Sequence, residues 1–220
     1  MRILSVDTCL GACSVAILDG EKILAHRFEL MDRGHAERLA PMVDEAMQQA
    51  AIAYADLDRL AVTVGPGTFT GQRVGLAFMR GMRVALKKPL IGITSLETIA
   101  AQAISESGIA CAAALHDARR DEVYLEIVRD GATILPPTVL LFADAAAKLA
   151  PLTDEASVVL CGTAAPRAKE DLACATLSPI RQPDALWTAR LAATREATST
   201  PPRPLYLRAP DAKLPGGKTP

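Results

Sequence analysis

The chain has 220 residues, half of them hydrophobic, and its charge is balanced, with 24 lysines and arginines against 25 aspartates and glutamates. This length is enough to bury a good core as one large domain or two small ones. The balanced charge and the 4% of aromatic residues argue against a broad basic surface with stacking rings, and so against independent tight binding of nucleic acid.

The start of the chain and its cysteines favour a cytoplasmic protein. Residues 1–7 reach a charged side chain too soon for a signal peptide, and no apolar run approaches the roughly 20 residues that span a bilayer. The five cysteines are an odd number without a Cys-x-x-Cys pair, which argues against a disulfide framework or a zinc site. We therefore expect a cytoplasmic chain with no membrane segment, no metal and no cofactor.

Hydrophobic periodicity predicts three strands and then alternating helices and strands in the first half of the chain. We expect strands over 2–7, 14–18, 22–30, 60–64 and 90–94, and helices over 35–51, over 72–87 and after an N-cap at Ser95. Pro41 lies inside the first helix and should kink it or mark a late start. This order is ribonuclease H-like, the building block of the actin, sugar-kinase and Hsp70 ATPases.

The second half of the chain carries a weaker pattern. Strand-like segments cover 110–115, 122–128 and 157–161, and helical segments begin near 142, 165 and 183. We find no internal repeat by inspection. We expect an N-terminal ribonuclease H-like lobe over 1–107, a smaller C-terminal α/β lobe over 108–198, and a proline-rich tail over 199–220 whose end past Pro210 is disordered.

A glycine-rich turn over 65–71 (Gly-Pro-Gly-Thr-Phe-Thr-Gly) joins a buried strand to a helix. Such a turn collects free backbone N–H groups where the helix dipole favours an anion. Gly65 and Gly67 permit a positive φ or a close approach of two backbones, and Thr68 or Thr70 can cap the helix. The turn is either shaped around a phosphate or another protein, or it is an ordinary connection. The local sequence favours the ordinary connection, since it matches neither Gly-x-Gly-x-x-Gly nor a Walker loop.

The helix expected over 72–87 has an apolar arc that covers more than half of its surface. Glycines at 71, 75 and 81 each cost about 1 kcal/mol relative to alanine inside a helix, which indicates a packing reason for them. The helix therefore buries two sides, the second against a neighbouring helix or a partner protein. The remaining face of this helix carries basic residues, and the stretch 68–96 that includes them contains no acid. This basic stretch is either a solvated face or a surface for an acidic partner.

Short segments that follow one another along nearly the whole chain resemble the TsaB family of the bacterial machinery that makes threonylcarbamoyladenosine in tRNA. They are MRILSVDT at 1–8, ACSVA at 12–16, HAERLAPM at 35–42, GPGTFTGQRVG at 65–75, DARR at 117–120, EVY at 122–124 and PLYLR at 204–208. The segments are densest before residue 125, and together they are specific.

The resemblance implies a two-lobed ASKHA fold, an α/β architecture of mixed sheets flanked by helices, related to the catalytic TsaD subunit. In this pathway TsaC makes threonylcarbamoyl-adenylate from threonine, bicarbonate and ATP. TsaD transfers the threonylcarbamoyl group to N6 of adenosine 37 in tRNAs that read ANN codons. TsaB binds TsaD and supports the transfer, and the ATPase TsaE engages the pair. The resemblance thus implies a non-catalytic scaffold that meets tRNA only indirectly.

The residues argue that this chain is not the transferase. TsaD proteins carry a His-x-x-x-His metal motif after the strand that corresponds to 90–94, and the matching positions here are Ser95 and Ile99. Isoleucine cannot bind a metal and serine is a poor replacement for imidazole. The turn after the first strand has one glycine and lacks the Gly-Thr-Thr density of working ATPases. We interpret the following residues as the relic of a nucleotide or anion site: Asp7, Thr8, Gly65, Gly67 and Thr68.

We expect the two amphipathic helices over 35–51 and 72–87 to lie side by side and to pair with a related lobe as a helical bundle. The partner is a TsaD-type subunit, or a second copy of the chain when TsaD is absent. We expect the bundle to hold Leu39, Met42, Gly75, Leu76, Met79 and Arg83.

Two other functions stay open at this point. The first is an autonomous enzyme, either an ASKHA ATPase or a glycoprotease-like metallopeptidase, which metal analysis and nucleotide titration would reveal. The second is a purely structural dimer without a role in the pathway, which a pull-down for a TsaD-type partner would separate from a scaffold.

Overall fold

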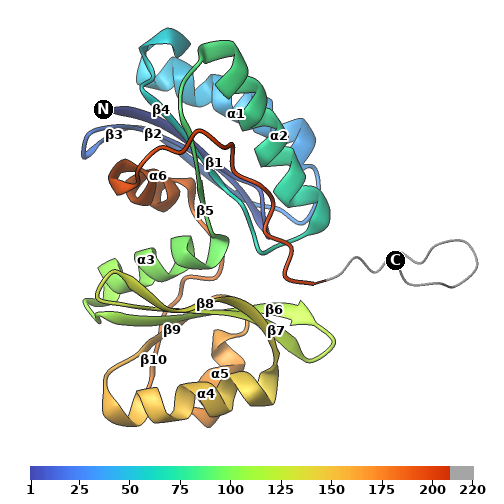
Figure 1. Ribbon diagram of the computed structural model, residues 1–220, viewed down its shortest axis with the longest axis vertical. Helices are drawn as coiled ribbons and strands as arrows, with labels where there is room; N and C mark the ends of the chain where they lie inside the picture. Colours follow the sequence, from blue (N-terminus) through green and yellow to red (C-terminus); the bar gives the residue numbers. More distant parts are fainter. Residues whose placement is uncertain (209–220) are drawn as a thin grey trace, which may run out of the picture.

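Two five-stranded mixed sheets form the centre of the protein in the computed structural model, which describes residues 1–208 (Figure 1). The first sheet has the order β3-β2-β1-β4-β5 and the second has the order β10-β9-β6-β7-β8. The strands of the first sheet are β1 (Arg2–Asp7), β2 (Ala12–Asp19), β3 (Lys22–Leu30), β4 (Arg59–Thr63) and β5 (Leu90–Ile93). Those of the second are β6 (Cys111–Arg119), β7 (Glu122–Arg129), β8 (Ala132–Leu141), β9 (Val159–Cys161) and β10 (Thr176–Leu177).

The two sheets share one topology. In each, the first strand pairs antiparallel with the second and parallel with the fourth, which pairs parallel with the fifth. The two halves of the chain therefore have the same topology, although we find no repeat in the sequence. A duplicated fold needs only the same spacing of apolar segments, so the side chains of the two halves are free to differ.

The helices cover the sheets in two ways. The helices α1 (His35–Ala50) and α2 (Phe69–Leu86) pack on the first sheet, and α4 (Phe142–Glu155) and α5 (Ala165–Asp171) pack on the second. The helices α3 (Ser95–Ser107) and α6 (Ala185–Thr194) are exchanged: α3 packs on β6, β7 and β9, whereas α6 packs on β1, β2 and β4 (Figure 1). A single 3₁₀ turn, η1 (Tyr54–Asp56), precedes β4.

The exchange changes one sequence expectation. We assigned residues 108–198 to the C-terminal lobe, but α6 lies on the first sheet, where Ala189 and Ala192 join Ile3, Leu18 and Ala61 in one buried cluster. Small residues on one side of α6 let it lie close to the sheet. The boundary that we expect between residues 107 and 108 stays a prediction, and it falls between α3 and β6.

Local details differ from the expected elements for identifiable reasons. Thr94, rather than Ser95, caps α3, because its side chain accepts a hydrogen bond from the N–H of Glu97 at 2.9 Å. Thr68 caps α2 in the same way, so that α2 begins at Phe69. We did not expect β8, whose Pro136 and Pro137 obscure the strand pattern; β8 is an edge strand, where proline is tolerated.

The C-terminal segment returns to the first sheet after α6, as Figure 1 shows in red. The N–H of Leu205 donates to the carbonyl of Val64 at 2.8 Å, and Pro202 packs against Gly92. The disorder that we expect past Pro210 lies outside the described residues. Within residues 1–208 no helix is both long and apolar enough to cross a membrane.

Candidate functional site

The predicted nucleotide site lies where β1 and β4 end, and its central carboxyl group is buried. Asp7 is fully buried, and its Oδ1 accepts hydrogen bonds from the hydroxyl of Thr63 and, at 3.2 Å, from the N–H of Cys9. Burial raises the pKa of Asp7 to about 7, with a smaller contribution from the charge of Asp184. Its Oδ2 has no hydrogen-bond donor among the described residues, which a neutral carboxyl group tolerates better than a carboxylate.

The glycines of the 65–71 turn and of α2 bring two backbones together. A Cβ on Gly67 would lie 2.3 Å from the carbonyl oxygen of Cys9, and one on Gly71 would lie 2.2 Å from that of Thr8. Thr68 N–H donates to the carbonyl of Cys9 at 2.8 Å, and the Thr8 hydroxyl donates to the carbonyl of Gly71 at 2.7 Å. These glycines therefore let α2 and its preceding turn sit on the residues that follow β1.

Two further glycines complete this contact. Gly65 has a φ of 104°, in the left-handed region that favours glycine, and its carbonyl accepts a hydrogen bond from Ser95 N–H at 2.9 Å. Gly75 N–H donates to the Thr8 hydroxyl at 3.0 Å. The structure thus brings Asp7, Thr8, Gly65, Gly67 and Thr68 together. The hydrogen bonds there connect the residues that follow β1 to the glycine-rich turn and to α2.

A segment from the far end of the chain covers the turn after β1. The side chain of Gln182 lies over Gly11, where Oε1 accepts a hydrogen bond from Gly11 N–H at 2.9 Å and Nε2 lies 3.0 Å from the position of a Cβ. Ala185 N–H donates to the Ser14 hydroxyl at 2.8 Å, and Asp184 accepts from His26 at 2.8 Å. Sequence reasoning missed this segment, because no motif connects residues so far apart in the chain.

The predicted partner residues lie mostly inside the first lobe. Leu39, Met42, Leu76 and Met79 are at most 2% exposed and belong to the core beneath α1 and α2. A side chain without accessible surface cannot touch another protein, so these four residues support the two helices from below and do not form a contact surface. Gly75 contacts Thr8 instead of a partner. Arg83 donates to the carbonyl of Ser199 at 3.0 Å.

Other residues give α1 and α2 an exposed apolar surface. On α2, Phe69 is 51% and Val84 is 73% exposed. Ala77, Gly81 and Ala85 are exposed on the same helix, and a Cβ on Gly81 would meet open space. On α1, Ala36, Ala40 and Pro41 are exposed. Hydrophobic periodicity could not separate these residues from the buried ones, because both sides of α2 are apolar.

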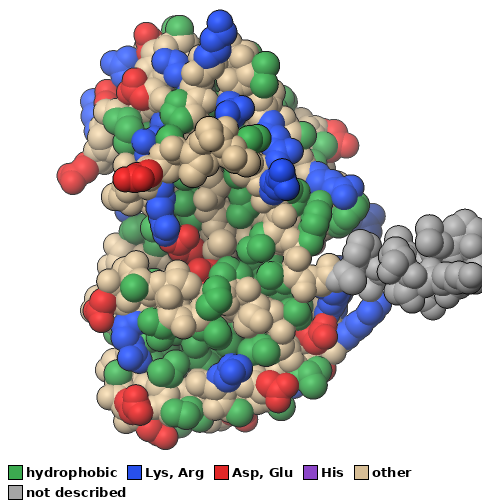
Figure 2. All heavy atoms as spheres, viewed as in Figure 1, with side chains coloured by type: hydrophobic (Ala, Val, Ile, Leu, Met, Phe, Trp, Pro, Cys, Tyr) green, Lys and Arg blue, Asp and Glu red, His purple; other side chains and the backbone are tan. Residues whose placement is uncertain are grey.

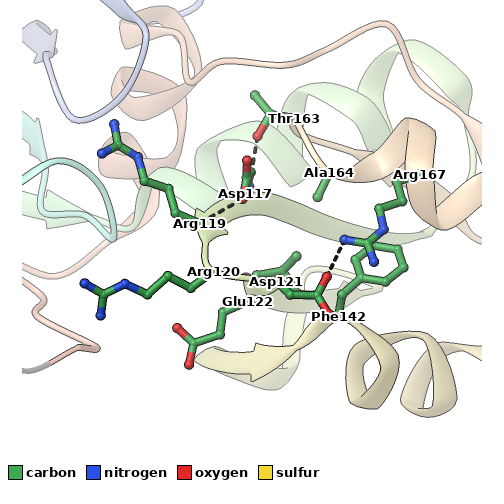
Figure 3. A pocket seen from close by; sticks show the side chains of 10 residues that line it. Asp117, Arg119, Arg120, Asp121, Glu122, Phe142, Thr163, Ala164 and Arg167 are labelled. Atoms are coloured by element: carbon green, nitrogen blue, oxygen red, sulfur yellow. Dashed lines mark hydrogen bonds and ion pairs between the residues drawn. The ribbon is translucent and has the colours of Figure 1, made fainter.

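A pocket of about 370 Å³ lies at the tip of the β6–β7 hairpin (Figure 3). Arg119, Arg120 and Asp121 form the tip, all with positive φ. On one wall Arg167 lies over the ring of Phe142, 3.7 Å from the ring centre, and pairs with Asp121 at 2.6 Å. The charges of this wall thus compensate one another.

The positions of the missing metal ligands are occupied by packed residues. Ser95 is buried and its hydroxyl donates to the carbonyl of Pro66 at 2.5 Å. Ile99 is buried in the cluster between α3 and the second sheet. In the part of the chain that the structure describes, no group of three or more His, Cys, Asp or Glu residues is arranged to hold a metal ion.

The architecture defines the class of the protein. Two sheets of equal topology, with α3 and α6 exchanged between them, are the two-lobed ASKHA fold of actin-like ATPases, as expected from the sequence. The activator component A of the Acidaminococcus fermentans (R)-2-hydroxyglutaryl-CoA dehydratase shares the fold, with a TM-score of 0.53 at 15% identity over 88% of this chain and 100% of that one.

Comparisons with known proteins define the family. A model of the TsaD family, described as tRNA N6-adenosine threonylcarbamoyltransferase, matches residues 24–178. The Escherichia coli tRNA threonylcarbamoyladenosine biosynthesis protein TsaB is 40% identical over 124 residues, which cover 56% of this chain and 53% of that protein. An uncharacterized protein of Mycobacterium tuberculosis is 36% identical over 96% of this chain and 93% of its own length.

A solved structure agrees with the sequence matches. A Pseudomonas aeruginosa protein described as similar to the peptidase YeaZ has a TM-score of 0.79 at 30% identity, over 94% of this chain and 99% of that one. The chain belongs to the TsaB family, the TsaD-related group of proteins that its sequence motifs resemble. The aligned segment spans about half the length of the Escherichia coli and Haemophilus influenzae TsaB proteins.

Proposed function

We propose that this chain is a non-catalytic subunit of the machinery that makes threonylcarbamoyladenosine at position 37 of tRNA. It binds a TsaD-type subunit and supports the transfer that this subunit carries out, together with TsaC and a TsaE-type ATPase. The support for the pathway is membership of the TsaB family. The support for a non-catalytic role is the turn after β1, where the Gln182 side chain accepts the N–H of Gly11, a backbone donor that a nucleotide phosphate would need.

The partner surface in this proposal is the exposed apolar surface of α1 and α2 without Phe69, which lies at the start of α2 against Tyr206. It consists of Ala36, Ala40 and Pro41 on α1 and of Ala77, Gly81, Val84 and Ala85 on α2. Its members Ala77, Gly81 and Ala85 follow one another at intervals of four residues on α2 and carry little or no side chain, so a helix of another subunit can approach closely. The same surface pairs two copies of the chain when the TsaD-type subunit is absent, because a surface that accepts a related lobe is self-complementary.

Reconstitution tests the proposal directly. Purified TsaC, TsaD and TsaE are combined with unmodified tRNA, threonine, bicarbonate and ATP, with and without this chain, and the modified nucleoside is measured by mass spectrometry. We expect product only when the chain is present, and none from the chain without TsaD. Undiminished product without the chain would contradict the supporting role. Product from the chain in place of TsaD would contradict the non-catalytic role.

Autonomous catalysis remains the alternative function, and the geometry around Asp7 and Ser95 disfavours it. An ATPase would need the turn after β1 to be open to phosphate, and a metallopeptidase would need imidazoles at Ser95 and Ile99. A stable dimer without a pathway role would fail to retain a TsaD-type subunit in a pull-down, which the proposed scaffold retains.

A further inference from the structure

The C-terminal segment over residues 199–208 orders a row of arginines on α2. Arg83 donates to the carbonyl of Ser199 at 3.0 Å, Arg80 to the carbonyl of Pro202 at 3.1 Å, and Arg73 to the hydroxyl of Tyr206 at 2.8 Å. All three partners are neutral oxygens, so the segment orders the guanidinium groups without neutralising their charge.

An exposed aromatic pair lies at one end of this row. The rings of Phe69 and Tyr206 stack with their centres 5.8 Å apart and an angle of 25° between their planes. The guanidinium of Arg73 lies 3.4 Å from the centre of the Phe69 ring. Phe69 is 51% and Tyr206 is 46% exposed, in a chain that has only 4 phenylalanines and 3 tyrosines. Two of these few rings therefore form a solvent-facing platform beside a row of positive charge.

The hairpin of the second sheet extends the positive surface. Arg208 donates to the carbonyl of Arg119 at 3.4 Å and forms an ion pair with Glu122, which ties the C-terminal segment to the β6–β7 tip. Figure 3 shows the side chains of Arg119 and Arg120 extending away from Phe142 and Arg167. Figure 2 shows Lys and Arg side chains gathered over α2 and beside this hairpin.

The acids near this surface are few and engaged. Residues 68–96 contain no acid, Glu122 pairs with Arg208, and Asp121 pairs with Arg167. The exposed Asp117 lies at the same hairpin, where its Oδ1 accepts a hydrogen bond from the N–H of Arg119 at 2.8 Å. Arg203 is exposed in the middle of the C-terminal segment. The chain as a whole has a net charge of −1, so this concentration of positive charge is a property of one face and not of the composition.

We propose that this face, formed by the arginines of α2, the Phe69–Tyr206 platform and the tip of the β6–β7 hairpin, binds a single-stranded RNA loop. Sequence-specific and loop-directed RNA recognition combines stacking of unpaired bases on aromatic or guanidinium planes with positive charge for the phosphates, and this face offers both. Arginines and aromatic rings also occur together in protein interfaces, so an acidic protein is the competing occupant of this face. The choice of RNA, the anticodon loop of tRNA, rests on the proposed function; the chain then contacts tRNA directly, not only through its partner.

Fluorescence anisotropy with a labelled anticodon stem-loop tests this inference on the full chain at several salt concentrations. We expect Tyr206→Ala to bind about tenfold more weakly with an unchanged salt dependence, because base stacking is lost and charge is kept. Tyr206→Phe, which keeps the ring and removes the hydroxyl, should bind within about twofold of the wild type. Arg203→Gln should weaken binding and lower the slope of log K against log salt by about 0.7.

The matched control for Arg203→Gln is Lys148→Gln on α4, an exposed cation of the second lobe that should leave binding unchanged. Equal affinities for the wild type, Tyr206→Ala and Arg203→Gln would overturn the inference, as would a wild-type chain that shows no salt-dependent binding. Unchanged RNA binding with lost capture of TsaD by Arg203→Gln would assign the face to an acidic protein instead. Binding needs no transferase, so a negative reconstitution with intact RNA binding overturns only the proposed function.

Discussion

The side chain of Gln182 accepts a hydrogen bond from the backbone of Gly11, on the turn where an ASKHA ATPase would hold a phosphate. The two residues come from opposite ends of the chain, and the contact depends on α6 lying on the first sheet. The protein therefore has the two-lobed architecture of actin-like ATPases, and a backbone N–H of the turn after β1 is bound by its own Gln182 side chain.

The first prediction concerns nucleotide binding and this contact. We expect calorimetric titration of the isolated chain to show no micromolar affinity for ATP–Mg²⁺. Gln182→Ala should lower the free energy of unfolding by about 1–2 kcal/mol, because Gly11 N–H loses its acceptor. Micromolar binding by the wild type would show that the turn opens in solution, and an unchanged stability of Gln182→Ala would show that the hydrogen bond is not formed.

Two glycine substitutions should have opposite effects on stability. Gly67→Ala forces a Cβ against the backbone of Cys9, so we expect a loss of several kcal/mol or a failure to fold. Gly81→Ala meets open space in a helix interior and should raise the free energy of unfolding by up to about 1 kcal/mol. Chemical denaturation followed by circular dichroism measures both, and a tolerated Gly67→Ala would contradict the close approach of the two backbones.

The partner surface is tested on an exposed residue, since Leu76 and Met79 lie in the core and glutamate there would unfold the lobe. We expect Ala77→Glu to abolish both the homodimer and the capture of a TsaD-type subunit, because an interface that accommodates a methyl group at this position has no room for the longer, charged side chain. Ala147→Glu, at an exposed position of α4, is the matched control. Light scattering and pull-down decide the outcome, with circular dichroism as the folding control; intact association of Ala77→Glu would place the interface elsewhere.

The pH dependence of stability should reflect the buried carboxyl of Asp7. Its pKa is about 7 in the folded chain and about 3.9 when unfolded, so the folded state binds more protons between these values. Stability should therefore fall as the pH rises from about 4 to 7 and level off above 7. Asp7→Asn stays neutral and should lose this part of the pH dependence, which is worth a few kcal/mol.

Denaturation of both forms at pH 5 and pH 8 measures the difference. Glu126, whose burial likewise raises its pKa to about 7, contributes a fall of the same sign in both forms, so the comparison isolates Asp7. Parallel curves for the wild type and Asp7→Asn would show that the carboxyl of Asp7 is solvated.

Local patterns were sufficient for most of the elements. The alternation of apolar residues over 22–30 and the amphipathic spacing after His35 predicted β3 and α1 at their observed starts, because both depend on neighbours in the chain. The pattern was insufficient for β8, where Pro136 and Pro137 interrupt it, and for α2, where apolar residues on both sides left the buried face undecided. The partner surface could not be predicted without knowing which face of α2 is buried.

The sequence by itself determined the order of strands and helices in the first half of the chain, the glycine-rich turn, the absence of the paired histidines and the family to which the chain belongs, because each of these depends on short segments of sequence. Only the tertiary structure decided that α3 and α6 exchange sheets, that Gln182 covers Gly11, and that the C-terminal segment aligns Arg73, Arg80 and Arg83. Apart from the packing of α3 on the second sheet, these contacts join residues about 100 or more positions apart. Which residues meet in these contacts depends on how whole helices and strands pack, and a local sequence pattern does not specify that packing.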